Sequence, residues 1–131
     1  MKILAPVDGS DCSFRALRFA TDLANRFEAP LHVIHITDSK GEDTKRILEK
    51  ASDILEEKGI SDEPEVKIDF HLAEPRYANR VGEAILELVE EEGYDHVVMG
   101  HHGSGRIQRA LLGSATDTVV RSDEVPVTII P

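Results

Sequence analysis

The sequence of 131 residues has a single cysteine, Cys12, and no long apolar run. One cysteine excludes an internal disulfide, and no cysteine cluster or H-E-x-x-H motif is present that would complete a zinc site. No apolar stretch approaches the roughly 20 residues that a membrane-spanning helix needs. The first ten residues, MKILAPVDGS, read as a β-strand and a turn rather than as a signal peptide. We therefore expect a soluble, cytoplasmic protein.

Basic side chains are also fewer than acidic ones. The chain has 15 Lys and Arg against 25 Asp and Glu, a formal net charge of −10. Nucleic acids and anionic membranes are bound through basic patches, so this composition disfavours both as partners. A phosphorylated ligand would instead depend on local N–H donors and a divalent cation. The length fits one domain, residues 1–131, that is large enough to bury a core.

Strand and helix patterns alternate along the chain without repeat or linker. Apolar runs predict strands at 3–7, 31–36, 66–72, 96–99 and 127–130. Helical spacing of apolar residues predicts helices from the cap at Ser10 or Asp11 to Phe27, at 47–55, at 81–89 and from 114 onward. Such alternation is typical of an α/β fold with a parallel sheet and helices on both faces. Strict alternation of apolar and polar residues in the third strand places it at or near a sheet edge.

The segment after the fourth predicted strand carries the strongest functional pattern. The strand ends at Gly100, Gly103 follows closely, and Gly113 precedes a helical pattern that begins at Ser114. Glycines after a strand let backbone amides approach a ligand. Ser114 and Asp117 have the spacing of a capping box, and the first turn of a helix offers unpaired N–H groups and a partial positive charge. The pattern predicts a phosphate cradle, and a nucleotide as its ligand.

These glycines match neither the G-x-x-x-x-G-K-[ST] loop nor the G-x-G-x-x-G motif. Their spacing, G-x2-G-x9-G-S, resembles the nucleotide-binding signature of the universal stress protein family, in its ATP-binding branch. The flanking segments MGHHG (99–103) and LLGSAT (111–116) are similar to the family's M-G-x-H-G and L-L-G-S-V-T/A. The resemblance covers nearly the whole chain. It implies a single-domain, open, five-stranded parallel sheet in the order 3-2-1-4-5.

In that order the carboxyl ends of strands 1 and 4 meet at the switch point where such sheets bind ligands. Asp8 ends the first strand, and its carboxylate can accept hydrogen bonds from both ribose hydroxyls or serve only as a turn and capping residue. Ile36 matches the family position whose backbone pairs with the adenine edge. The residues expected to bind the nucleotide are Pro6, Val7, Asp8, Ile36, Met99, Gly100, His102, Gly103, Arg106, Gly113, Ser114, Ala115 and Thr116.

The resemblance implies ATP as the ligand, with Mg²⁺ or Mn²⁺. Arg106 and Arg109 lie between the glycines, where a cation could meet phosphate oxygens or remain a solvated loop charge. His101 and His102 are the only candidate general bases, and neither has a visible partner that would orient its ring. We expect an ATP-binding stress-response protein with slow hydrolysis or self-phosphorylation at most. The remaining alternative is a dimerising scaffold that binds no nucleotide.

One loop departs from the family pattern. Family members usually carry Gly-x-Pro after the third strand, whereas this chain has Ala73 at that place, or Asn79 if Ile85 is aligned with the family's helix. Because the family's loop borders the base side of the pocket, the base specificity stays open.

The last predicted strand has the composition of a paired edge. It carries no charge and no internal proline between Val127 and Ile130. Edge strands of monomeric proteins are usually protected by such residues. We therefore expect a homodimer through Val125, Val127 and Ile129 about a two-fold axis, the contact that the resemblance also implies. The alternative is a strand short enough to need no partner.

Overall fold

The computed structural model describes residues 1–69, 80–103 and 111–131, and in these residues five strands alternate with four helices. The elements are β1 (Ile3–Pro6), α1 (Asp11–Phe27), β2 (Leu31–Thr37), α2 (Glu42–Glu57), β3 (Glu65–Ile68), α3 (Arg80–Glu92), β4 (His96–Gly100), α4 (Ser114–Arg121) and β5 (Val127–Ile130). All strand pairs are parallel, and the order is β3-β2-β1-β4-β5. This confirms the fold class and the strand order expected from the sequence.

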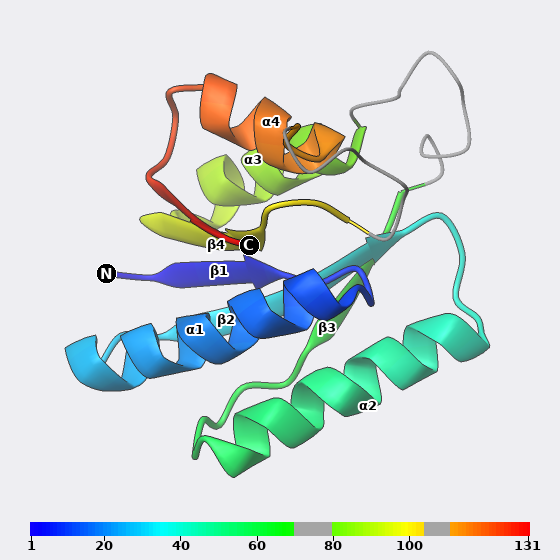
Figure 1. Cartoon of the computed structure of the whole chain (residues 1–131), viewed down its shortest axis with the longest axis vertical. Helices are drawn as coiled ribbons and strands as arrows, with labels where there is room; N and C mark the ends of the chain where they lie inside the picture. Colours follow the sequence, from blue (N-terminus) through cyan, green and yellow to red (C-terminus); the bar gives the residue numbers. More distant parts are fainter. Residues whose placement is uncertain (70–79, 104–110) are drawn as a thin grey trace.

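The sheet is the middle of three layers, with α1 and α2 on one face and α3 and α4 on the other (Figure 1). Successive strand residues point to opposite faces, so Ile3 packs under α1 and α2 while Leu4 packs under α3 and α4. Both side chains are fully buried. Burial on both faces explains why the central strands read as continuous apolar runs rather than alternating ones.

Most element ends follow from local chemistry. The Ser10 side chain caps α1 by accepting a hydrogen bond from the backbone N–H of Ser13 at 3.1 Å. Gly59 and Gly93 follow α2 and α3 with φ of +71°, a conformation that favours glycine at helix ends. The edge position of β3 is confirmed. The strand ends at Ile68 rather than at 72, and residues 70–79 lie outside the described part of the chain.

One helix residue departs from the expected pattern. Phe27 was expected on the buried face of α1, but it is 65% exposed and lies beyond Ala24, the last buried residue of that helix. Glu28 follows in the left-handed region (φ 50°) and ends the helix without a glycine.

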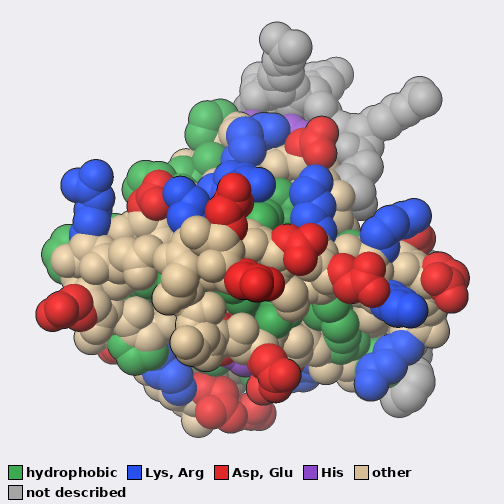
Figure 2. All heavy atoms as spheres, turned by 90° about the horizontal axis from the view of Figure 1, so that it is seen from below, with side chains coloured by type: hydrophobic (Ala, Val, Ile, Leu, Met, Phe, Trp, Pro, Cys, Tyr) green, Lys and Arg blue, Asp and Glu red, His purple; other side chains and the backbone are tan. Residues whose placement is uncertain are grey.

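The face that carries α1 and α2 shows acidic and basic side chains intermingled (Figure 2). Ion pairs join the two helices there, Arg18 with Glu57 at 2.9 Å and Lys58 with Asp22 at 3.1 Å. This face therefore has no continuous basic surface that could bind a polyanion, in keeping with the acidic composition.

A polar cluster lies near the amino end of β2, on the side of the sheet opposite to the strand carboxyl ends. His32 Nδ1 lies 3.1 Å from Asp62 Oδ1, and Asp62 Oδ2 accepts the backbone N–H of Val33 at 3.0 Å. Glu65 is 3.5 Å from His32 Nε2. The hydrogen bond to Asp62 raises the pKa of His32 above its ordinary value. Burial raises the pKa of Tyr94, whose ring stacks against His32, to about 12.

This cluster makes stability depend on pH with a defined sign. Because folding raises the pKa of His32, its contribution is fully present below the ordinary value of 6.5 and is lost as pH rises through the folded pKa. We expect His32→Asn, which keeps a neutral donor, to be less stable than wild type at low pH, with a gap that narrows as pH rises. Urea unfolding at a series of pH values measures that gap.

His96 provides a control of opposite sign. Burial lowers its pKa, so wild-type His96 costs stability as pH falls through the ordinary value of 6.5. His96→Asn should therefore gain stability relative to wild type at low pH. If the His32→Asn gap is the same at every pH, the His32–Asp62 bond does not carry the charge assigned to it.

Candidate functional site

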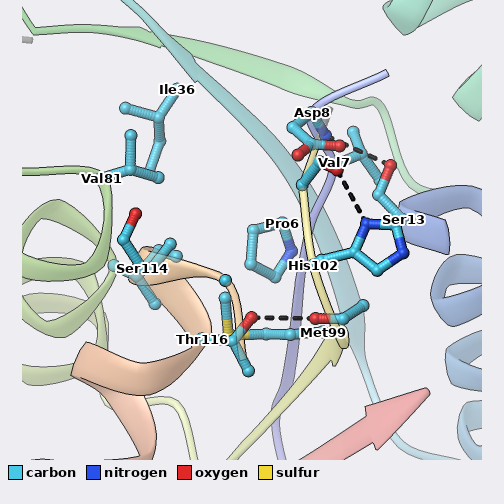
Figure 3. A pocket seen from close by; sticks show the side chains of 15 residues that line it. Pro6, Val7, Asp8, Ser13, Ile36, Val81, Met99, His102, Ser114 and Thr116 are labelled. Atoms are coloured by element: carbon cyan, nitrogen blue, oxygen red, sulfur yellow. Dashed lines mark hydrogen bonds between the residues drawn. The ribbon is translucent and has the colours of Figure 1, made fainter. Parts of the chain in front are cut away.

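A cavity of about 340 Å³ opens at the carboxyl ends of β1 and β4, where the strand order reverses (Figure 3). It is lined by Pro6, Val7, Asp8, Ser13, Ile36, Val81, Ile85, Met99, Gly100, His102, Gly103, Gly113, Ser114, Ala115 and Thr116. Every residue expected to bind the nucleotide lines this cavity except Arg106, which, like Arg109, lies outside the described residues. The structure thus brings these residues together, while their binding roles stay predictions.

Asp8 fills the turn role that the sequence allowed it, while its ribose role stays a prediction. Its Oδ1 accepts hydrogen bonds from the backbone N–H of Ser10 at 2.9 Å and from the Ser10 hydroxyl at 2.6 Å, so it stabilises the turn into α1. Its Oδ2 makes no hydrogen bond with a described residue and faces Gly103, where an added Cβ would lie only 2.5 Å away. One oxygen is therefore committed to the turn, and the other remains available at the cavity wall.

The two glycine segments pack backbone against backbone. The N–H of Gly113 donates to the carbonyl of His101 at 2.9 Å, and a Cβ at Gly113 would lie 3.1 Å from the Cα of His102. A Cβ at Gly100 would lie 2.8 Å from Cys12 Sγ. Glycine is thus required here by close contacts within the protein, in addition to any contact with a ligand.

The predicted capping box at the start of α4 is wrong. Gly113 is the N-cap, with extended backbone (ψ 153°), and it makes no side-chain capping bond. Ser114 is therefore the first helical residue, one position too late for its hydroxyl to cap the helix. The Asp117 carboxylate pairs with Arg121 at 2.9 Å instead of reaching back to the cap.

This shift leaves donors free at the cavity. The Ser114 hydroxyl and the backbone N–H groups of Ser114, Ala115 and Thr116 make no hydrogen bond with any described residue. The Ser114 hydroxyl points into the cavity (Figure 3). Together with the partial positive charge of the helix start, these donors suit an anion.

Two other polar groups at this end of the sheet are structural. Thr116 was expected to bind the nucleotide, but its hydroxyl donates to the carbonyl of Gly100 at 2.8 Å and ties α4 to the end of β4. Cys12 is buried, with its Sγ 3.2 Å from the carbonyl oxygen of Ile130 and 3.2 Å from the backbone nitrogen of His101. Cys12 is thus a packing residue between α1 and the ends of β4 and β5.

The expectation that neither histidine has an orienting partner is wrong for His102. Its Nδ1 donates to the carbonyl of Gly103 at 2.9 Å, so the loop's own backbone fixes the ring, and Nε2 has no hydrogen bond with a described residue. The ring lies at the same side of the cavity as Asp8 and Ser13 (Figure 3). The His101 ring stands edge-on to it, with 6.0 Å between centroids.

Sequence reasoning missed three lining residues, Ser13, Val81 and Ile85. Ser13 follows the acidic turn, and its Oγ accepts the backbone N–H of Asp8 at 3.3 Å. Val81 and Ile85 lie at the helical spacing that predicted the third helix; Ile85 belongs to the core, and Val81, partly buried, packs against it. Periodicity identifies an inward face but does not distinguish positions that face a cavity from positions that face other side chains.

The described residues hold neither a metal-binding cluster nor a membrane-spanning helix. Residues 1–69, 80–103 and 111–131 contain no group of three or more His, Cys, Asp or Glu side chains that could hold a metal ion. In the same residues no helix has both the length and the apolarity to cross a membrane. The cytoplasmic location stays a prediction.

Fold and site together define an open, doubly wound α/β protein with a glycine-lined cavity at its switch point. The sequence matches the universal stress protein family over residues 1–131, and the chain belongs to that family. Universal stress protein MJ0531 of Methanocaldococcus jannaschii is 31% identical over 141 residues, which cover 98% of this chain and 81% of that protein.

Two solved structures show the same fold with a nucleotide. A universal stress protein from Archaeoglobus fulgidus in complex with dAMP superposes with a TM-score of 0.74 at 27% identity, covering 100% of this chain and 98% of that one. A universal stress protein in complex with cAMP has a TM-score of 0.76 at 26% identity and covers 100% and 96% of the two chains.

Proposed function

We propose that this universal stress protein binds ATP in the switch-point cavity, with Mg²⁺ or Mn²⁺, and acts as a cytoplasmic homodimeric stress-response module, residues 1–131, whose occupancy other proteins read. The observation that carries the proposal is the arrangement of the cavity. Free donors of the first turn of α4 line it together with a carboxylate oxygen of Asp8 that has no partner among the described residues.

The phosphates are assigned to the glycine side of the cavity. The free N–H groups of Ser114, Ala115 and Thr116, with the Ser114 hydroxyl, supply neutral donors and a helix dipole. Such donors are what an acidic protein needs if it is to hold an anion without a basic patch. The sequence also places Arg106 near the phosphates, and that role stays a prediction.

The nucleoside is assigned to the remainder of the cavity. Pro6, Ile36 and Met99 form apolar walls, and Asp8 offers an acceptor for ribose hydroxyls. A volume of about 340 Å³ is in the range of small-molecule sites. The dAMP and cAMP found in the two related structures are adenine nucleotides, which supports adenine as the base.

A divalent cation would arrive with the nucleotide. Mg²⁺ in nucleotide sites is typically held by phosphates and water with one or two carboxylates. The described residues contain no preformed metal cluster, so we assign its ligands mainly to the phosphates. The cation would neutralise phosphate charge that the cavity's neutral donors only partly offset.

Hydrolysis is proposed to be slow. The Nε2 of His102 has no partner among the described residues, and no carboxylate among them is hydrogen-bonded to the ring to support it as a strong base. A nucleotide-free scaffold, the other alternative, gives no role to the free donors at the start of α4.

Calorimetric titration of ATP with Mg²⁺ tests the proposal through Asp8. Asp8→Asn keeps the shape of the side chain but weakens hydrogen bonds to the ribose, and bonds to charged groups are worth about 1.5–3 kcal/mol each. We expect ATP affinity to fall by roughly tenfold or more. Wild type should also bind 2′,3′-dideoxy-ATP more weakly than ATP. Equal affinity for the two ligands would show that Asp8 does not read the ribose, and no ATP binding by wild type would refute the proposed function.

A further inference from the structure

Two apolar side chains from different layers lie beside each other at one end of the cavity. Figure 3 shows Ile36, from β2, next to Val81, from the first turn of α3, on the side away from Asp8 and His102. Ile85, one turn further along α3, is fully buried and belongs to the core, whereas Val81 is only partly buried. Val81 is therefore the wall residue whose size can change without emptying the core.

A chain of polar contacts ties these two walls together. The Arg80 Nε donates to Asp69 Oδ2 at 2.6 Å, and the backbone N–H of Asp69 donates to the carbonyl of Thr37 at 2.8 Å. Thr37 and Arg80 are the chain neighbours of Ile36 and Val81. The Asp69 side chain is 5% exposed and that of Arg80 18%, so water screens this ion pair little. Glu87 also binds the two terminal nitrogens of Arg80, at 2.9 and 3.2 Å.

The residue on the other side of Val81 fixes α3 against α4. A Cβ at Gly82 would lie 2.6 Å from the Cβ of Thr118 and 3.0 Å from the carbonyl oxygen of Ala115. The two helices can approach this closely only because residue 82 has no side chain. Ala115 itself lines the cavity, so the contact sets the distance between Val81 and the start of α4.

We propose that Val81 is a specificity-determining residue for the base of the bound nucleotide, with Arg80 and Gly82 as the positioning residues that hold it against Ile36. The inference rests on the proposed function and deepens it. The side chains of Val81 and Ile36 form an apolar slot for the flat face of a purine, and the flanking contacts keep the slot at one width. The phosphate donors lie at the start of α4 and do not depend on the size of residue 81.

The size of residue 81 is tested with three ligands, each in the presence of Mg²⁺: ATP, CTP and inorganic tripolyphosphate. Val81→Phe narrows the slot, so we expect ATP affinity to fall roughly tenfold, CTP affinity to fall less, and tripolyphosphate affinity to stay unchanged. Val81→Ala removes wall contacts and should weaken ATP roughly fivefold, again without affecting tripolyphosphate. Calorimetry gives all three affinities for each variant.

Val89→Ala is the matched control. Val89 lies two turns further along α3, is 8% exposed and does not line the cavity. This variant should lose stability in urea unfolding while it keeps the wild-type ratio of ATP to CTP affinity. If Val89→Ala changed the ratio of ATP to CTP affinity as much as the Val81 variants do, the change would reflect a general loosening of α3. That result would refute a specific role for Val81.

The positioning role of Gly82 is tested by adding a Cβ at residue 82 of α3 and then removing the facing side chain at residue 118 of α4. Gly82→Ala should push α3 from α4 and change the ratio of ATP to CTP affinity. Gly82→Ala combined with Thr118→Gly removes the closest side-chain contact of the new Cβ and should restore the ratio in part. A merely structural role would alter stability in both variants without restoring selectivity.

The outcomes separate the two proposals. If wild type binds neither ATP nor tripolyphosphate, the proposed function fails and the inference fails with it. If wild type binds ATP but Val81→Phe and Val81→Ala keep the wild-type affinity ratios among the three ligands, the inference alone is overturned.

Discussion

A Gly103→Ala variant is expected to lose ATP affinity by roughly 100-fold while it remains folded. The added Cβ would lie 2.5 Å from Asp8 Oδ2, closer than any real contact allows. The carboxylate cannot simply rotate away, because its Oδ1 is held by the backbone N–H and the hydroxyl of Ser10 at 2.9 and 2.6 Å. Either the carboxylate leaves its turn or the glycine loop moves away from the first turn of α4. Calorimetry with ATP and Mg²⁺ measures the loss.

Gly41→Ala is the control for the substitution itself. Gly41, the N-cap of α2, has φ −155° and no atom within 4 Å of an added Cβ, so alanine fits there without a clash. The double variant Asp8→Ala/Gly103→Ala removes the clash. If the clash is the cause, its ATP affinity should be no worse than that of Asp8→Ala alone. Full ATP affinity in Gly103→Ala, with thermal unfolding like wild type, would mean that Asp8 and Gly103 do not border the bound nucleotide.

An Ile129→Pro variant is expected to convert the proposed homodimer into a monomer. Carbonyl oxygens of Pro126 and Ile130 accept hydrogen bonds from the β4 side at 3.0 and 2.7 Å, so these residues turn their backbone groups inward. Because backbone groups alternate along a strand, Val127 and Ile129 turn theirs to the open edge. Proline at 129 therefore removes an outward N–H and leaves the bonds to β4 in place. Light scattering at micromolar concentration reads the mass directly.

Thr128→Pro is the matched control, because it removes an N–H that faces β4. That variant should lose stability in urea unfolding, whereas Ile129→Pro should lose its partner and keep most of its ATP affinity. Lysine at both Val127 and Ile129 should also separate the subunits, although Val127 packs partly against the core and its replacement costs stability as well. A monomeric wild type would refute the dimer, and a dimeric Ile129→Pro would place the interface elsewhere.

Local sequence patterns were sufficient to predict most of the helices and strands. The apolar runs of β1 and β4 and the helical spacing in α1 and α3 each reflect burial of a whole element, and burial leaves a periodic trace in the sequence. The strand order was expected from family resemblance rather than from periodicity, which carries no information on which strands are neighbours. Phe27 shows the limit of periodicity, since its spacing fits a buried face and its position at the helix end leaves it exposed.

The candidate site was predictable where a residue type is itself diagnostic. Asp8 and the glycines stood out because a carboxylate at a strand end and glycines ahead of a helix are typical of nucleotide sites, although the same residue types also serve turns and close backbone contacts. Ser114 was recognised for the wrong reason, because its capping pattern is one residue out of register with the observed helix. Val81 could not be recognised at all, since a valine at helical spacing reads the same whether it faces a core or a cavity.

By itself the sequence determined the alternating elements, the acidic composition and the glycine segments predicted to form a phosphate cradle, because each can be recognised from residues that are close together in the chain. Only the tertiary structure decided which polar groups at the cavity have no hydrogen-bond partner among the described residues. Asp8 Oδ2 faces Gly103, and the Thr116 hydroxyl donates to the carbonyl of Gly100. The ion pair Arg80–Asp69 connects the cavity wall at Val81 to the wall at Ile36. These are contacts between residues far apart in the chain. Their distances depend on how the layers pack, and no local pattern records that packing.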